Sequence, residues 1–584
     1  MEFPIQKSQE EKYSVTFFQH IRVFEYIVSA AIFLCVLVVV VYCIWTLDRG
    51  FEITDEAYYL LLAQHAASVK YYISAQQWIT GGIWQITRSL VMFRAAGMLL
   101  LVASSTLLAL GAIKAFSQTK LRSSNVTDRH VAVIASSIIS GLLYSTTINL
   151  SPCYNLLASS SACVAAGLVL FSSSNNIKWQ RYVLLFLAGI AIGVEFICKP
   201  SAGIATFAIL IIWMFIFNQS LKAKISAVAV TIVGFVLFVT VLLYTKTTIQ
   251  GVSSSIIHGF ELFRMVQFEP ITTRLERYFF NFFYYCFESA KSHFILIVAI
   301  VIYQINRREV FLGIAFTSLI YTLAASKYWH ATADQCLLIM KTIFVLSALI
   351  LLISRRLWWK DSKAIYLVCM LIILPYSVAL GTGNSLFTQV IVSIAPWGVM
   401  LALLATSDFE NRLDKNLVLI LFACQFIFIS LEIINGGIKK PYHLMKPLIK
   451  QSYPVAVESL GIIKVDMETK KFIGDLKSAS DTCNIVRGAP FLGLYNVPGV
   501  ALAMGAVPVL TPWLNNKTQA EFVIENNHNI SADSTVIALN ILEDGKFPQL
   551  PKQLTMFPTG YRYCGMAIYP YMHQKIQIWQ QHSK

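Results

Sequence analysis

Charged residues are scarce in this sequence of 584 residues, since only 13% are Asp, Glu, Lys or Arg. An ordinary soluble domain carries about 25% charged residues. Here 56% of the residues are hydrophobic and the mean hydropathy is +0.63. The apolar residues fall into blocks of about 20, the length that an α-helix needs to cross the hydrocarbon core of a bilayer. The composition therefore excludes an ordinary soluble protein and predicts an integral membrane protein.

Several motifs are missing as well. No CxxC pair or Cys/His ligand spacing occurs among the 11 cysteines, so no zinc site is predicted. No GxxxxGK[ST] or strand–GxGxxG–helix pattern occurs, which argues against a nucleotide-binding domain. The formal net charge is +15, but the basic residues are scattered over short loops between apolar blocks. The positive-inside rule explains that distribution, so nucleic-acid binding is not expected.

About thirteen apolar blocks predict membrane-spanning helices, so the fold class is an all-α polytopic membrane protein. The blocks lie at residues 27–46, 90–113, 131–149, 156–173, 183–198, 201–217, 226–245, 292–305, 310–325, 337–354, 364–380, 386–406 and 416–433. No signal-peptide cleavage site follows the first block, so we expect it to remain a span, with residues 1–26 in the cytoplasm. Positive charges in alternate loops, such as Arg307-Arg308 and Arg355-Arg356, agree with that orientation.

An odd number of spans places residues 434–584 outside the cytoplasm, as a soluble domain. Asp466–Ser480 has a helical pattern, whereas Phe491–Tyr495 and Thr535–Ile541 are typical of strands, which predicts a small α/β domain. Its only cysteines are Cys483 and Cys564. Outside the cytoplasm they would form a disulfide; two unpaired thiols are the alternative.

Within the transmembrane part, residues 27–433, two outer loops are much longer than the others, at 47–89 and 246–291. Both contain amphipathic stretches rich in aromatic residues, from Tyr58-Tyr59 to Trp78 and from Phe279 to Phe287. Such helices lie in the membrane interface with their apolar faces in the acyl boundary. They suit a protein that acts on lipid-borne substrates.

The first long loop opens with an acidic motif. Asp48, Glu52, Asp55 and Glu56 fall within nine residues just after the first span. One interpretation is structural: Thr54 or Asp55 caps an interfacial helix that carries Glu56 in its first turn. The other is functional, because paired carboxylates at the membrane surface suit general base catalysis.

An Asp-Glu-x-x-Tyr motif after the first span, followed by a long outer loop, resembles the GT-C glycosyltransferases. These include the protein O-mannosyltransferases and the lipid A aminoarabinose transferases, and the latter share a plan of thirteen spans and an outer soluble domain. The resemblance implies an inverting glycosyltransferase that moves a sugar from a polyprenyl (undecaprenyl) phosphate to a lipid, glycan or protein acceptor. It also implies a bacterial cytoplasmic membrane with the reaction and the C-terminal domain on the periplasmic side.

Such a reaction needs a carboxylate and cations. The carboxylate takes the proton of the attacking acceptor hydroxyl, for which we expect Asp55 first, then Glu56 and Asp48. The leaving phosphate needs cationic partners rather than a general acid. The candidates are Lys199, Arg94, Arg88, Lys327, His330 and Arg264. Lys199 could instead be a snorkelling lysine, Lys327 and His330 part of an interfacial aromatic belt, and Arg264 one member of a salt-bridged helix face.

Substrate contacts are expected from aromatic and amide side chains of the outer loops. These are Tyr58, Tyr59, Tyr154, Asn155 and Asn384. Asn384 ends Gly381-Thr382-Gly383-Asn384, a possible phosphate-binding helix start or a plain turn. GT-C enzymes often have a second acidic residue near the second outer turn, and Ser151–Asn155 contains none. That difference argues against a metal-assisted mechanism with two carboxylates, and no metal ligands are predicted.

Two other functions use the same features. A polysaccharide polymerase or ligase also acts on lipid-linked sugars, and Arg264 and His330 would suit it. A transporter or flippase would have many spans, but internal repeats and charged residues at the midplane are the signs of that class. The acidic residues gather at the outer rim instead, which favours the glycosyltransferase.

Overall fold

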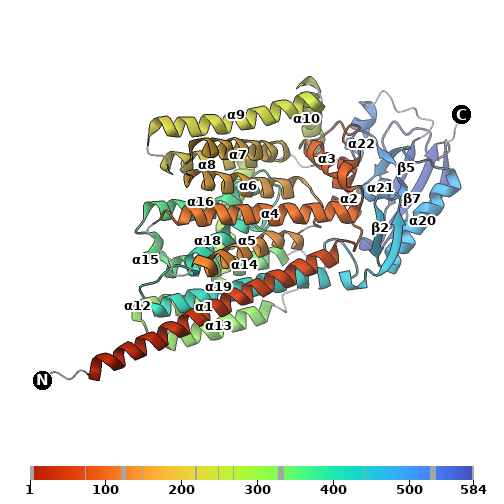
Figure 1. Ribbon diagram of the computed structural model, residues 1–584. Coiled ribbons are helices and arrows are strands. Elements are labelled where there is room, and N and C mark those ends of the chain that lie inside the picture. The colour runs from red at the N-terminus through yellow and green to blue at the C-terminus, as the bar shows by residue number, and fades with distance from the viewer. Residues whose placement is uncertain are drawn as a thin grey trace.

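A helical bundle makes up the first three quarters of the computed structural model, which describes residues 5–581 except 73, 120–125, 148, 176, 218–219, 247–248, 267–268, 309, 327–334, 440 and 527–534. Eight helices in the described residues are long and apolar enough to cross a membrane. They are α1 (Ile5–Thr46, apolar from Glu25), α4 (Leu90–Phe116), α6 (Tyr154–Ser173), α7 (Lys178–Cys198), α8 (Pro200–Phe217), α9 (Leu221–Lys246), α16 (Ser362–Ala379) and α19 (Arg412–Lys439). They lie side by side in one bundle (Figure 1).

Two further candidate spans are pairs of helices that bend sharply. The first pair, α11 (Ile271–Ser292) and α12 (Phe294–Asn306), bends by 78°; the second, Leu386–Ser393 and α18 (Ala395–Ala405), bends by 76°. Leu386–Ser393 consists of α17 (Leu386–Gln389) and a 3-10 turn, η2 (Val390–Ser393). Shorter apolar helices occupy the other predicted spans: α5 (Val126–Leu142) with η1 (Leu143–Thr146), α13 (Val310–Ser326) and α14 (Gln335–Ile353). Every predicted span overlaps an apolar helix, and eight to ten candidate spans in the described residues confirm the multi-span fold class.

The predicted span at 386–406 corresponds to two apolar segments joined by a sharp bend. Pro396 occupies the first turn of α18, where its missing N–H removes no helical hydrogen bond. A proline inside a helix kinks or breaks it, and the axis bends by 76° between Leu386–Ser393 and α18.

Small residues let the helices approach closely. A Cβ atom on Gly111 of α4 would lie 2.4 Å from the carbonyl oxygen of Gly167 in α6, so only glycine fits there. Helices in a bilayer associate through such close backbone contacts, because burying apolar surface against lipid-like side chains gives little driving force.

Both long loops lie at one end of the bundle. The helices α2 (Asp55–Gln64), α3 (Gln77–Thr87) and α10 (Ile249–Arg264) lie next to the C-terminal region (Figure 1). The start of α1 and the basic turn α15 (Arg355–Trp358) lie at the opposite end. The start of α1 and the C-terminal region thus lie at opposite ends of the bundle. This requires the chain to pass along the bundle an odd number of times, α1 included.

The C-terminal region is a mixed α/β fold, as predicted. It contains a hairpin of β1 (Tyr453–Val457) and β2 (Gly461–Val465), and a five-stranded sheet in the order β4-β3-β5-β7-β6. The strands of that sheet are β3 (Pro490–Leu494), β4 (Val507–Pro508), β5 (Val536–Ile541), β6 (Tyr561–Tyr569) and β7 (Gln574–Gln581). β3 runs parallel to β4 and β5, and β7 runs antiparallel to β5 and β6. The helices are α20 (Met467–Cys483), α21 (Pro498–Met504) and α22 (Lys517–Glu525), with 3-10 turns η3 (Leu448–Lys450) and η5 (Tyr571–His573).

Local chemistry fixes α20 at both ends. The Asp466 carboxylate accepts a hydrogen bond from the backbone N–H of Thr469 at 2.9 Å and so caps the helix. At the other end, a disulfide joins Cys483 to Cys564 of β6, across a Cα–Cα distance of 5.5 Å. The helix is thereby held against the sheet.

The first long loop is built into the core of the α/β region. One cluster of buried apolar side chains contains Phe51, Ile53, Ala57 and Leu60 from the loop together with Val457, Phe472, Val500 and Tyr569 from the C-terminal region. Backbone bonds join the two parts: Gly50 N–H donates to the Lys464 carbonyl, and Gly499 N–H to the Ile53 carbonyl, each at 2.8 Å. The loop that carries the acidic motif is therefore positioned by residues about 400 positions later in the chain.

Candidate active site

The carboxylate of Glu52 holds the start of α2. Its Oε1 accepts hydrogen bonds from the Thr54 backbone N–H at 2.6 Å and from the Thr54 hydroxyl, and its Oε2 accepts from the Glu56 N–H at 2.8 Å. Thr54 occupies the N-cap position, as one of the two predictions had it, but its side chain makes no capping bond. The buried Glu52 carboxylate takes that role, because it satisfies the orphan N–H groups of the helix start.

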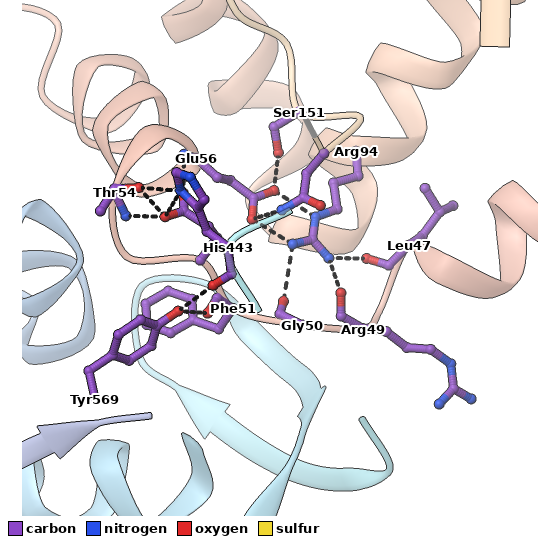
Figure 2. A network of polar contacts seen from close by, with 12 residues as sticks. Leu47, Arg49, Gly50, Phe51, Thr54, Glu56, Arg94, Ser151, His443 and Tyr569 are labelled. Carbon is purple, nitrogen blue, oxygen red and sulfur yellow. Dashed lines mark hydrogen bonds and ion pairs between the residues drawn. The ribbon is translucent and has the colours of Figure 1, made fainter. Parts of the chain in front are cut away.

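Glu56 is fully occupied by a buried ion pair with Arg94 of α4 (Figure 2). The guanidinium donates from Nε to Oε1 at 2.7 Å and from Nη2 to Oε2 at 2.6 Å. Asn149 and Ser151 donate to the same carboxylate at 2.7 and 2.6 Å. The remaining N–H groups of Arg94 donate to the carbonyl oxygens of Leu47, Arg49 and Gly50. All five donors of Arg94 are in use, so the pair ties α2 and the first loop to α4.

Asp55 has a different environment, although it adjoins Glu56. Its Oδ2 accepts a hydrogen bond from the Tyr442 hydroxyl at 2.5 Å. Its Oδ1 has no hydrogen-bond partner in the described part of the chain. Burial raises the pKa of Asp55, and Glu52 raises it further, while the Tyr442 bond and His443 act in the opposite direction. Asp55 is therefore a half-buried carboxylate with one oxygen available for a ligand.

The segment that holds Asp55 comes from the end of the last span. Tyr442 stacks on His443 with ring centroids 3.9 Å apart, and His443 stacks on Tyr571 at 5.1 Å. His443 Nδ1 lies 3.5 Å from Glu52 Oε1 and 3.1 Å from the Thr54 hydroxyl. Sequence reasoning missed Tyr442, His443 and Glu52 as site residues. The one available signal was a tyrosine and a histidine directly after Pro441, where a span ends.

A row of side chains leads from Asp55 to a buried lysine. Tyr59 lies one turn further along α2, and its ring centroid is 5.9 Å from that of Tyr154. Lys199 Nζ lies 5.9 Å from the centroid of Tyr154. The ammonium donates to the carbonyl oxygen of Val378 at 2.7 Å and to Asn155 Oδ1 at 3.4 Å. The structure thus brings five predicted residues together, although they come from three separate segments.

The environment of Lys199 makes its charge sensitive to pH. Burial lowers the pKa of Lys199 to about 8, while Glu195 and Cys153 act in the opposite direction. An ammonium has three N–H donors, and Val378 and Asn155 take two of them. One donor therefore remains for an anion.

The Gly381–Asn384 turn lies beside Lys199. A Cβ on Gly381 would lie 4.0 Å from Lys199 Cε and 2.1 Å from the Ser201 hydroxyl oxygen. Asn384 is exposed and donates to Gln389 Oε1 at 3.0 Å. The hydroxyl of Tyr278, from α11, donates to the Thr382 carbonyl oxygen. The second long loop therefore reaches the lysine end of the row.

Tyr58 faces the α/β region instead. Its ring meets that of Trp513 edge-on, with centroids 5.5 Å apart. The Trp513 indole N–H donates to Asn496 Oδ1 at 2.7 Å. The C-terminal region thus forms a wall one helical turn from Asp55.

Other predicted site residues lie elsewhere. Asp48 accepts an ion pair from Lys464 of β2 at 2.7 Å and so belongs to the junction with the α/β region. Arg88 is exposed at the end of α3, where its Nε donates to the Gln85 carbonyl oxygen. Arg264 is exposed at the end of α10. Lys327 and His330 lie outside the described residues. Within the described residues, no group of three His, Cys, Asp or Glu side chains is placed to hold a metal ion.

Solved structures with a similar chain path come from two groups of enzymes. The oligosaccharyltransferase of Archaeoglobus fulgidus, solved with zinc and sulfate, matches with a TM-score of 0.46 and 11% identity over 91% of this chain and 79% of that one. ArnT from Cupriavidus metallidurans, bound to undecaprenyl phosphate, matches with a TM-score of 0.44 and 13% identity over 93% and 97%. ArnT in the apo state gives 0.41 and 12% over the same shares. No protein-family model and no curated protein matches the sequence. At these identities, the function has to be argued from the residues of this chain.

Proposed function

We propose that this protein is an inverting glycosyltransferase that moves a sugar from a polyprenyl-phosphate carrier to an acceptor hydroxyl. The reaction takes place at the membrane face that carries the α/β region. The observation behind this proposal is the contrast between two adjacent carboxylates. Glu56 has all its oxygens engaged, whereas Asp55 has a free oxygen at the start of a tyrosine row that ends at a buried lysine.

Asp55 acts as the general base in this proposal. An acceptor hydroxyl donates to Oδ1 of Asp55 and attacks the anomeric carbon, and its proton passes to the carboxylate. The bond between the anomeric carbon and the acceptor oxygen forms as the bond to the phosphate oxygen breaks. A raised pKa makes Asp55 a stronger base than an exposed aspartate, and Tyr442 orients it. One base and one displacement invert the anomeric centre.

Lys199 stabilises the leaving phosphate. The phosphate departs with the electron pair of the broken bond, so it needs a cation rather than a proton. Tyr59 and Tyr154 form one apolar wall for the sugar, and Tyr58 with Trp513 borders it on the side of the α/β region. Asn155 and Asn384 supply amide groups for its hydroxyls. Such a site mixes large aromatic surfaces with a few fixed polar groups, as small-molecule sites do.

The location follows from the same proposal. The carrier, undecaprenyl phosphate, belongs to the bacterial cytoplasmic membrane, and the α/β region would lie in the periplasm. Lipid, glycan and protein acceptors all offer a hydroxyl to Asp55, so this mechanism applies to each of them.

A transfer assay tests the reaction class. Purified membranes that contain the full chain receive radiolabelled sugar on undecaprenyl phosphate, and label in an acceptor fraction is counted. We expect transfer from the monophosphate-linked sugar and none from membranes without the protein. Transfer only from diphosphate-linked oligosaccharides would contradict the proposal and support a polymerase or ligase.

Lys199 should give donor binding a pH dependence of its own. A phosphodiester donor keeps its charge, so its affinity should fall as Lys199 loses its proton, by about tenfold between pH 7 and pH 9 for a pKa of about 8. Lys199→Arg should retain its charge and abolish this loss, because guanidinium stays protonated. The measurement is the KM for donor against pH in the two proteins. Identical pH profiles would remove Lys199 from the phosphate site.

A further inference from the structure

A second polar pocket lies behind the active site, at the outer ends of α1, η1 and α19. Its lining includes Tyr42, Arg49, Asn149, Gly437 and Tyr442. Arg94 also lines it, so the Arg94–Glu56 pair separates the pocket from the first turn of α2. Tyr442 connects this pocket with the candidate active site, because its side chain lines the pocket and its hydroxyl donates to Asp55.

Arg49 supplies a guanidinium with donors to spare. Its Nε donates to the Trp45 carbonyl oxygen at 3.2 Å and its Nη1 to the Gln451 carbonyl oxygen at 2.7 Å. The guanidinium carbon lies 4.0 Å from the centroid of the Trp45 ring, so one face is covered. Of five N–H donors, three remain uncommitted within the described residues. Their fork geometry matches the oxygens of a phosphate.

Among the charged side chains around the pocket, the positive charge of Arg49 is the one left without a close counter-ion. Arg94 is neutralised by Glu56 at 2.6 Å. Asp48, the carboxylate beside Arg49, lies 3.7 Å from Arg49 Nε but 2.7 Å from Lys464 Nζ. The Arg94–Glu56 and Asp48–Lys464 pairs are each neutral, so Arg49 gives the pocket a net positive charge. A net positive charge favours the binding of an anion.

Tyr42 also lines this pocket. Its hydroxyl is buried and has no hydrogen-bond partner among the described residues. A buried hydroxyl without a partner is costly unless a ligand or water satisfies it. A Cβ on Gly437 would lie 1.8 Å from that hydroxyl, so the glycine keeps room for it. Asn149 gives one amide N–H to Glu56 and has a second to offer.

Two candidate spans end at this pocket. Thr46 belongs to the last turn of α1 and Gly437 to the last turn of α19, and both line the pocket. The outer end of a span lies level with the lipid head groups and the adjoining acyl chains. Leu47, Leu150 and Leu448 add apolar side chains to the lining. A free anion would have no use for them, whereas a lipid has both a phosphate and a chain.

We infer that this pocket binds the phosphate group of a membrane lipid, in the leaflet next to the α/β region, through Arg49, Tyr42 and Asn149. The binding goes beyond the proposed transfer and does not depend on it. Because Tyr442 contacts both the pocket and Asp55, the bound lipid also adjoins the residue that orients the carboxylate.

Native mass spectrometry of the purified full chain in detergent tests this inference. Dioleoyl phosphatidic acid is titrated against the wild type, Tyr42→Phe and Arg49→Lys, with dioleoylglycerol as the phosphate-free lipid. Tyr244→Phe, at an exposed position of α9, is the matched control. We expect tighter binding of phosphatidic acid than of dioleoylglycerol, with Kd raised roughly threefold in Tyr42→Phe and tenfold in Arg49→Lys. Tyr244→Phe should match the wild type.

Tyr42→Phe keeps the test decisive if Arg49→Lys fails to fold, because the removed hydroxyl bonds to no described residue. The unfolding temperature of each variant, without added lipid, verifies the fold. Wild-type affinity for phosphatidic acid in folded Tyr42→Phe and Arg49→Lys would overturn the assignment of the pocket. Competition by inorganic phosphate at the same site would support it, whereas binding of inorganic phosphate without binding of the lipid would overturn the lipid as occupant.

Discussion

Replacing Asp55 by Asn is expected to lower the rate of sugar transfer by about 10²–10⁴-fold, the usual contribution of a general base. The amide has nearly the shape of the carboxylate but cannot take the proton of the acceptor hydroxyl. Its oxygen can still accept the Tyr442 hydrogen bond, so the fold should persist. The measurement is kcat for transfer from the labelled polyprenyl-phosphate sugar, in protein shown to be folded by its unfolding temperature.

Asp48→Asn is the matched control for this variant. It makes the same change in the same loop, at a carboxylate that pairs with Lys464 rather than facing the tyrosine row. We expect its rate to stay within about twofold of the wild type, since such half-exposed pairs contribute little. Tyr442→Phe should fall between the two, because Asp55 would lose its orienting bond but keep its charge. A folded Asp55→Asn protein with the wild-type rate would exclude Asp55 as the base.

Glu56→Gln should have the opposite profile, a loss of stability rather than of chemistry. The side chains of Glu56 and Arg94 are 1% and 2% exposed, and removing one charge leaves the other buried without a counter-ion. Breaking such a pair costs about 3–5 kcal/mol, which is a large part of the stability of most folds. The unfolding midpoint of the purified protein, followed by tryptophan fluorescence, measures this effect.

Two further variants separate charge from packing. Glu410→Gln breaks an exposed ion pair with Lys360, whose side chains are 79% and 67% exposed, and should leave the midpoint unchanged. The double variant Glu56→Gln, Arg94→Met should recover part of the loss, because no unpaired charge then remains buried. A Glu56→Gln protein that unfolds at the wild-type temperature and has lost its activity would reverse the roles given to Asp55 and Glu56.

Hydropathy predicted the bundle well, because a bilayer imposes one length and one composition on every span. The mixed α/β region also followed from local patterns, for example the helical pattern of α20 and the mostly apolar run of β5. The sharp bend within 386–406 was not predicted. That segment has the composition of a span, and the turn at Pro396 depends on packing that a hydropathy average ignores.

The site was predictable only in part. The sequence singled out Asp55 and Lys199 as candidates, because a carboxylate after a span and a lysine between two spans are conspicuous. It could not distinguish Glu56, which pairs with Arg94, from Asp55, which does not. That distinction depends on where Arg94 lies in the folded protein. Tyr442 and His443 were missed because nothing in their local sequence shows that residues 387 and 389 positions apart are neighbours of Asp55 and Thr54.

The shared core of the first loop and the α/β region has a consequence for how the protein is made. A ribosome completes the acidic motif early, but Tyr442, Phe472 and Tyr569, which hold or cover it, are synthesised only at the end. Domains usually fold in order from the N-terminus as they emerge. Here the first loop packs against residues that are synthesised last, so we expect the acidic motif to reach its final position only once the C-terminal region has folded.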